Sequence, residues 1–96
     1  MSVIVELSIF PMDKGVSVSP YVSRVVKTIK ASGLPYSLNS MGTCIEGDWA
    51  QVHALVDQCF KALEQDCDRI YLTLKADYRK GRVDGMRKKV ASVNEK

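Results

Sequence analysis

Hydrophobic and polar positions alternate with a period of two near both ends of the chain. In residues 3–10 every odd position is apolar, while the even positions mix apolar, acidic, hydroxyl and aromatic side chains. Residues 69–77 repeat this pattern, with apolar even positions and polar odd positions. A period of two places alternate side chains on opposite faces of a β-strand. Both segments are therefore predicted to be strands with one face in a core and a second face of mixed chemistry.

Apolar residues recur at helical spacing in three other segments. The first starts at Ser19-Pro20, where we expect the serine hydroxyl to cap the helix ahead of a proline, and it stops at Ser32-Gly33. The second runs from about Trp49 to Gln65, and Asp48 is placed to cap it. The third is short and covers about residues 83–94. These patterns predict two full helices and an additional C-terminal one.

Residues 36–48 predict two short strands joined by a turn, followed by the start of the second helix. The glycine of Met41-Gly42 suits the turn between two β-favouring runs. The pattern does not fix the register of this hairpin. One face of the sheet therefore receives Tyr36, Leu38 and Ser40 or their neighbours, together with either Thr43 and Ile45 or Cys44 and Glu46.

The predicted order is β-α-β-β-α-β, which is the ferredoxin-like arrangement of the α+β class. Right-handed crossovers would place both full helices on one face of a four-stranded antiparallel sheet. We expect residues 1–96 to form a single domain, with the helix over 83–94 appended to it. We also expect the first and last strands to be neighbours in the middle of the sheet.

Composition and charge narrow the possible functions. The chain has 96 residues and a net charge of +3, but residues 79–96 hold seven basic and two acidic residues, a net charge of +5, which leaves −2 for the rest. This uneven charge does not favour a nucleic-acid-binding surface. The three cysteines lack metal-ligand spacing, and no segment resembles a secretory signal or a membrane span. We therefore expect a cytoplasmic protein that binds neither a metal nor a membrane.

The face of the sheet opposite the helices, called the open face below, mixes aromatic, hydroxyl and charged side chains. One interpretation is an ordinary solvated face with cross-strand pairs, such as Glu6 with Lys75. The other is that a second copy of the chain covers it, with the polar groups pairing across the interface or lining a small pocket. Apolar walls with a few orienting polar groups are typical of small-molecule sites.

Three runs together resemble one known family: MGTCIEGDW at 41–49, DRIYLTLKADYRKGR at 68–82 and KKVASVNEK at 88–96. They are similar to the thiamine-binding protein family, whose small ferredoxin-like members were long known only as conserved proteins of unknown function. The resemblance covers nearly the whole chain. It implies a homotetramer built as a dimer of dimers. It also implies that thiamine or a related pyrimidine, such as hydroxymethylpyrimidine, lies on the open face near a subunit interface.

The side chains available suit that ligand. A thiazolium cation favours a carboxylate or an aromatic face, and an aminopyrimidine favours hydroxyl and amide groups. The candidate ligand-binding residues are Phe10, Tyr36, Leu38, Ser40, Thr43 and Glu6. We expect no catalytic residues, no metal ligands and no cofactor other than the bound ligand itself.

Three other functions compete with ligand binding. An acylphosphatase-like enzyme needs an arginine in the loop after the first strand, and residues 11–18 contain none. An RNA-binding sheet stacks bases on aromatic residues, but the last strand offers only Tyr71 without alternating basic residues. A structural or regulatory oligomer without a ligand remains the main alternative.

Overall fold

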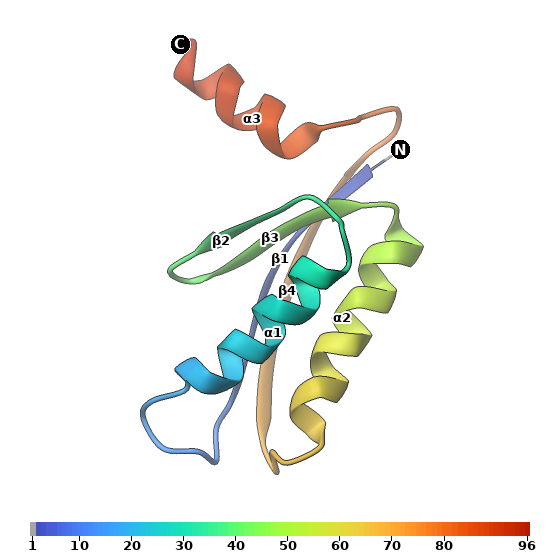
Figure 1. Ribbon diagram of the computed structural model, residues 1–96. Coiled ribbons are helices and arrows are strands. Elements are labelled where there is room, and N and C mark those ends of the chain that lie inside the picture. The colour runs from blue at the N-terminus through green and yellow to red at the C-terminus, as the bar shows by residue number, and fades with distance from the viewer. Residues whose placement is uncertain (1) are drawn as a thin grey trace.

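The computed structural model describes residues 2–96 and contains a four-stranded sheet and three helices (Figure 1). In chain order the elements are β1 (Ser2–Pro11), α1 (Ser19–Ala31), β2 (Tyr36–Asn39), β3 (Gly42–Gly47), α2 (Trp49–Glu64), β4 (Ile70–Arg79) and α3 (Gly85–Asn94). The ferredoxin-like order β-α-β-β-α-β with an added C-terminal helix is therefore confirmed. No helix within residues 2–96 is both long and apolar enough to cross a membrane.

The sheet is antiparallel throughout, with the strand order β2-β3-β1-β4. The prediction that the first and last strands share the middle of the sheet was wrong, because β4 lies at an edge. Each helical crossover skips one strand, so α2 carries the chain from β3 over β1 to the free side of β1. Consequently β1 pairs with both β3 and β4, and the centre of the sheet is formed by β1 and β3.

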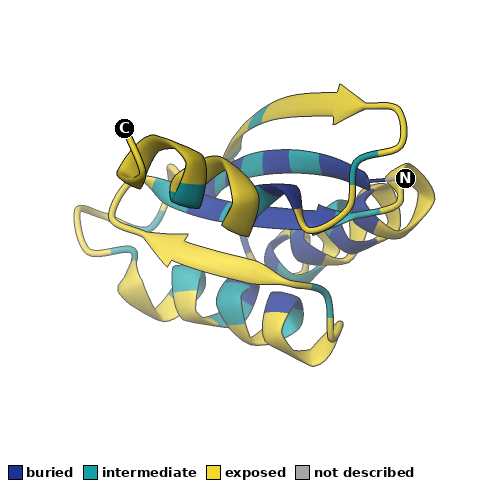
Figure 2. Cartoon of the chain, turned by 90° about the horizontal axis from the view of Figure 1, so that it is seen from above, coloured by how far each residue is buried: buried dark blue, intermediate teal, exposed yellow. Residues whose placement is uncertain are grey.

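One face of the two central strands forms the core with α1 and α2, which lie side by side on it (Figure 1). The odd positions of β1 are buried as the alternation predicts, and Ile45 of β3 joins them. The two helices contribute six further buried or nearly buried side chains: Val25, Ile29, Val52, Leu55, Cys59 and Leu63. Figure 2 shows the central strands mostly buried and the two edge strands mostly exposed.

The helix ends confirm two of the capping predictions made from the sequence and contradict a third. Gly33 ends α1 with φ of +76°, the left-handed conformation expected there. The Oε1 of Gln51 accepts a hydrogen bond of 3.1 Å from the N–H of Asp48, as in a capping box. The prediction for Ser19 was wrong, because Val18 occupies the N-cap position and no side chain caps that helix. The proline fits within the first turn, so the helix includes the serine as a helical residue.

Replacing a core leucine should cost far more stability than replacing an exposed one. Leu63 is fully buried between α2 and the sheet, whereas Leu38 is 56% exposed. We expect Leu63→Ala to lower the free energy of unfolding by about 2–5 kcal/mol because it leaves a cavity. Leu38→Ala should change it by about 0.5 kcal/mol or less. Urea denaturation of both variants measures the difference, and equal losses would contradict the core described above.

Candidate functional site

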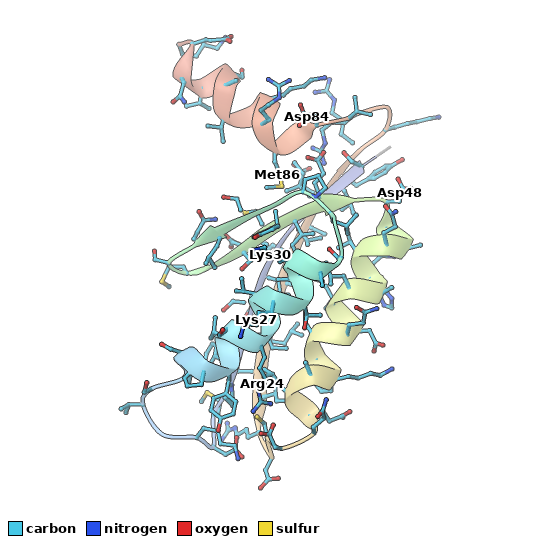
Figure 3. All side chains as sticks on the ribbon, viewed as in Figure 1. Arg24, Lys27, Lys30, Asp48, Asp84 and Met86 are labelled. Carbon is cyan, nitrogen blue, oxygen red and sulfur yellow. The ribbon has the colours of Figure 1, made fainter. Side chains whose placement is uncertain are left out.

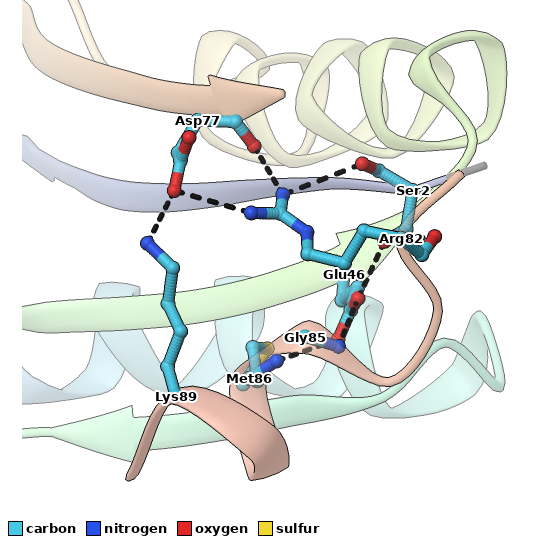
Figure 4. Close-up of polar contacts among 7 residues, drawn as sticks. All are labelled: Ser2, Glu46, Asp77, Arg82, Gly85, Met86 and Lys89. Carbon is cyan, nitrogen blue, oxygen red and sulfur yellow. Dashed lines mark hydrogen bonds and ion pairs between the residues drawn. The ribbon is translucent and has the colours of Figure 1, made fainter. Parts of the chain in front are cut away.

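The N-terminal end of α3 is held against the open face by one carboxylate (Figure 4). Glu46 of β3 is 4% exposed and accepts hydrogen bonds from the hydroxyl of Ser2 at 2.6 Å and from the N–H groups of Gly85 at 2.7 Å and Met86 at 3.0 Å. The first N–H groups of a helix have no partner within the helix, and an anion there is stabilising. Glu46 therefore caps a helix that follows it by about forty residues.

These contacts decide the charge of Glu46. Burial by itself would raise the pKa of the carboxyl group, because it disfavours the charged form. The hydrogen bonds from Met86, Ser2 and Gly85, with the positive charge of Arg82, outweigh burial and lower the pKa below its ordinary value. Glu46 is therefore an anion at neutral pH, held by groups of its own chain.

A second group of charges fixes the segment between β4 and α3. The guanidinium of Arg82 donates to the carbonyl oxygen of Asp77 at 2.6 Å, to its carboxylate at 3.2 Å and to the carbonyl oxygen of Ser2 at 3.3 Å. Lys89 of α3 pairs with the same carboxylate, and the two cations lower the pKa of Asp77. A Cβ atom on Gly85 would lie 2.5 Å from the Cδ of Arg82, so any other residue at this position would require the Arg82 side chain to shift.

A cleft of about 570 Å³ lies between α3 and the β2–β3 hairpin; we call it the α3 cleft. Its volume is in the range of small-molecule sites. Figure 3 shows Met86 reaching from α3 toward the hairpin. The apolar walls come from Ile4, Pro35, Tyr36, Met86 and Val90, and the polar lining from Ser37, Asn39, Cys44, Glu46, Asp84, Arg87 and Lys89.

The uncharged polar groups of the α3 cleft are the ones open to a ligand. The side-chain amide of Asn39 makes only long contacts, 3.4 Å to the carbonyl oxygen of Ser37 and 3.8 Å to the sulfur of Cys44. In contrast, Glu46 is already bound to three donors and Asp84 pairs with Arg87. The cleft can therefore offer an amide, a hydroxyl and a thiol at little cost, whereas its carboxylates are engaged.

The hairpin register resolves the alternative that the sequence left open. Thr43 pairs with Leu7 and Ile45 pairs with Val5, so both side chains face the helices. Across the hairpin, Leu38 lies opposite Thr43 and Tyr36 lies opposite Ile45, on that same face. The open face instead receives the alternate set, Ser37, Asn39, Cys44 and Glu46. The structure therefore selects the second alternative, and three of the candidate ligand-binding residues, Tyr36, Leu38 and Thr43, lie on the face toward the helices.

The structure separates the six candidate ligand-binding residues. Tyr36, at the edge of the sheet, lines the α3 cleft. A second cleft of about 260 Å³, between α1 and the tip of the hairpin, is bordered by Phe10, Leu38, Ser40 and Thr43. Phe10 also stacks on Tyr71, with ring centroids 5.8 Å apart. Whether any of the six touches a ligand stays a prediction.

Glu6 lies on the open face but lines neither cleft. Its carboxylate pairs with Lys75 of β4 at 3.0 Å, the cross-strand pair that the sequence offered as the alternative to ligand binding. Sequence reasoning left Asn39, Met86 and Val90 out of the candidate ligand-binding residues, although all three line the α3 cleft. The signal for Asn39 was present in the alternation of β3. With Ile45 in the core, the even-numbered residues of β3 and the β2 residues paired with them must lie on the open face. No sequence pattern places α3 over the hairpin.

Residues 5–94 match the family model described as thiamine-binding protein. The chain belongs to the thiamine-binding protein family. A UPF0045 protein of Mycobacterium bovis is 38% identical to it over 94 residues, which cover 97% of this chain and 92% of that protein. A UPF0045 protein of Methanocaldococcus jannaschii is 33% identical over 93 residues, covering 97% of this chain and 93% of that protein.

Solved structures show the same fold. The crystal structure of the Methanocaldococcus jannaschii protein aligns with a TM-score of 0.90 at 33% identity, over 99% of this chain and 98% of that one. A Thermotoga maritima protein, named as a candidate for thiamine biosynthesis or salvage, aligns with a TM-score of 0.86 at 24% identity over 97% and 99% of the two chains. At that identity the likeness establishes the fold alone.

Removing the charge of Glu46 should release α3. In Glu46→Gln the new NH₂ group would face N–H donors, so at least one donor at the helix start loses its acceptor, at a cost of about 1–3 kcal/mol. We expect faster amide hydrogen exchange throughout residues 85–94, measured by mass spectrometry. Glu64→Gln, at the exposed end of α2, is the matched control and should leave this exchange unchanged. Equal protection of α3 in both variants would show that Glu46 does not hold the helix.

Acid should release α3 in the same way. Because the pKa of Glu46 is lower in the folded state, its contribution is fully present above its ordinary pKa of 4.5 and is lost as the pH falls through the folded value. We expect the amides of Gly85 and Met86 to lose protection at acidic pH, after correction for intrinsic exchange rates, while core amides of β1 stay protected. In Glu46→Gln this specific acid dependence should disappear. Its persistence in the variant would assign it to another group.

Proposed function

We propose that this protein is a non-catalytic, cytoplasmic binding protein for thiamine or a related pyrimidine, and that the α3 cleft holds the pyrimidine ring. The supporting observation is the position of the cleft on the open face, where the amide of Asn39, which makes only long hydrogen bonds, lies between apolar walls. Membership of the thiamine-binding protein family supports the choice of ligand. Three free thiols support a reducing compartment.

The chemistry of the cleft suits the pyrimidine half of thiamine. An aminopyrimidine presents one donor group beside ring-nitrogen acceptors, and the amide of Asn39 can both donate and accept. The hydroxyl of Ser37 supplies a further donor or acceptor beside it. Met86 and Ile4 provide apolar surface for the ring, and the thioether sulfur of methionine packs well against such rings.

The thiazolium half has no free carboxylate among the residues that line the cleft. Glu46 is saturated with hydrogen bonds, and Asp84 pairs with Arg87. A further cation beside Arg87 and Lys89 would find no free negative charge, because the carboxylates there already pair with these two side chains. We therefore place the thiazolium at the mouth of the cleft, in contact with solvent. Hydroxymethylpyrimidine should then bind almost as tightly as thiamine.

We further propose that the protein works as a homotetramer built as a dimer of dimers. The apolar stripe of α3 supports association, because Val90 and Val93 are 62% and 73% exposed in the single chain. A structural or regulatory oligomer without a ligand is the competing function, and the same exposed stripe would serve it. Ligand titration separates the two.

Isothermal titration with thiamine and with hydroxymethylpyrimidine tests the proposal. We expect both to bind, and Asn39→Ala to weaken both by about tenfold, the effect of a lost hydrogen bond of about 1.4 kcal/mol. Asn94→Ala, at the far end of α3, is the matched control and should bind like the unmodified protein. Flat traces for both compounds at millimolar concentration would remove the ligand and leave the oligomer. Equal binding by both variants would move the site out of the α3 cleft.

A further inference from the structure

The backbone at the start of α3 is unusual. The carbonyl oxygen of Asp84 accepts a hydrogen bond of 3.1 Å from the N–H of Lys88, so Asp84 occupies the N-cap position. An N-cap residue normally has an extended backbone and a side chain that binds an N–H group of the first turn. Asp84 instead has φ of +54° and ψ of +40°, and its side chain makes no capping hydrogen bond. No other non-glycine residue within 2–96 has a positive φ.

Glu46 takes a donor that Asp84 would otherwise use. An N-cap carboxylate accepts a hydrogen bond from the second or third N–H of its helix, which here belong to Met86 and Arg87. The N–H of Met86 instead donates to Glu46 at 3.0 Å, beside that of Gly85 (Figure 4). The carboxylate of Asp84 pairs with the side chain of Arg87. The first turn of α3 therefore lies beside two carboxylates, and only the distant one caps it.

The surroundings of Asp84 maintain its left-handed backbone. This conformation is unfavourable for residues that carry a Cβ atom, although aspartate tolerates it better than most. Such backbone persists where surrounding contacts impose it, and it is concentrated at functional sites and switch regions. Here the hydrogen bonds to Glu46 impose it, because they fix the direction in which the first turn of α3 leaves Asp84. Without those bonds, Asp84 is free to take the extended conformation of an ordinary N-cap residue.

We propose that α3 exchanges between two caps, and that this exchange opens and closes the α3 cleft. In the docked state, which is the one described above, Glu46 caps the helix and Asp84 is left-handed. In the released state, Asp84 has an extended backbone and its own carboxylate caps the helix. The two states exclude each other because both carboxylates use the N–H of Met86. Since each state has a cap, α3 leaves the sheet with its first turn still capped.

The pivot of this motion lies between Arg82 and Gly85. The side chain of Arg82 is 10% exposed and its guanidinium binds β1 and β4, so this residue stays with the sheet. Val83 is 60% exposed, so turning the backbone of Val83 and Asp84 disturbs little packing. Beyond the pivot, the ion pair between Lys89 and β4 is exposed, and such pairs contribute little to stability. The bonds to Glu46 are therefore the main hold on α3.

Release of α3 removes one wall of the α3 cleft. The helix and its N-cap residue supply Asp84, Met86, Arg87, Lys89 and Val90 to the lining. A ligand that contacts both this wall and the hairpin binds the docked state alone and shifts the equilibrium toward it. This effect of a ligand rests on the proposed function, because it requires a ligand in this cleft. The exchange of caps itself does not.

The first experiment follows the backbone of residue 84 by NMR, from its Cα and Cβ chemical shifts and its coupling between HN and Hα. We expect a positive φ in the unmodified protein and in the control Glu64→Gln, and an extended backbone in Glu46→Gln. The shifts of β1 report that each variant is folded. Glu46→Asp provides a second variant, because the shorter side chain keeps its charge but withdraws from α3. An Asp84 that stays left-handed in both Glu46 variants, or is extended in the unmodified protein, would overturn the exchange of caps.

The second experiment tests whether Asp84 caps the released helix, in the Glu46→Gln background. Asp84→Asn and Asp84→Ala both remove the charge that pairs with Arg87, but only asparagine can cap a helix. We expect helical Cα shifts over residues 87–93 to persist with asparagine. With alanine the ratio of helix to coil should fall by about fivefold, the usual effect of a lost cap. Equal helix content in the two double variants would show that residue 84 is not the second cap.

Hydroxymethylpyrimidine is the probe for the third experiment, which separates this inference from the proposed function. At a concentration that saturates Glu46→Gln, we expect the shifts of residue 84 to move back toward those of the unmodified protein. Binding that leaves these shifts where they were would overturn the closing of the cleft by α3. No binding to the unmodified protein in calorimetry would remove the proposed function instead, and the first two experiments would still decide the exchange of caps.

Discussion

The carboxylate of Glu46 is the constraint on which the open face depends. It is buried, charged and bound to donors from both ends of the chain, Ser2 at the start of β1 and Gly85 and Met86 at the start of α3. A buried carboxylate is costly unless such donors surround it, and helix N-termini are good sources of them. The charge and the helix therefore require each other. Without this pairing α3 would keep few contacts with the sheet, and the α3 cleft would lose the wall that the helix provides.

Ion pairs within the chain explain why so many charges on the open face are not available to a ligand. Glu6 pairs with Lys75, Asp77 with Arg82 and Lys89, and Asp84 with Arg87. Most of these pairs are exposed and contribute little to stability individually. Together they fix the position of α3 and of the loop before it. Arg82, which precedes Gly85 in the sequence, and Lys89, which follows it, both bind the carboxylate of Asp77.

The fold could be predicted from the sequence because its signals are local. Alternation in residues 3–10 and 69–77 marks two strands, and helical spacing with Gly33 and Asp48 marks the helices. The predictions that were wrong concern features that depend on contacts between segments far apart in the sequence. The edge position of β4 follows from the crossovers and not from its own pattern, which reads like that of a covered strand. The role of Glu46 depends on the N–H groups of residues far along the chain, which no spacing reveals.

The site was harder to predict than the fold, because a strand pattern with a period of two defines two faces without showing which one packs against the helices. For the hairpin, the decisive residue is Ile45, whose side chain is fully buried opposite Val5. Placing it in the core commits Thr43 and Leu38 to the helix side and leaves Asn39 and Cys44 on the other. A half-polar sheet face is thus weak evidence for a charged ligand, since its charges hold the protein together. The groups that remain for recognition are the neutral ones, which suits a heterocycle read by its hydrogen-bonding edge.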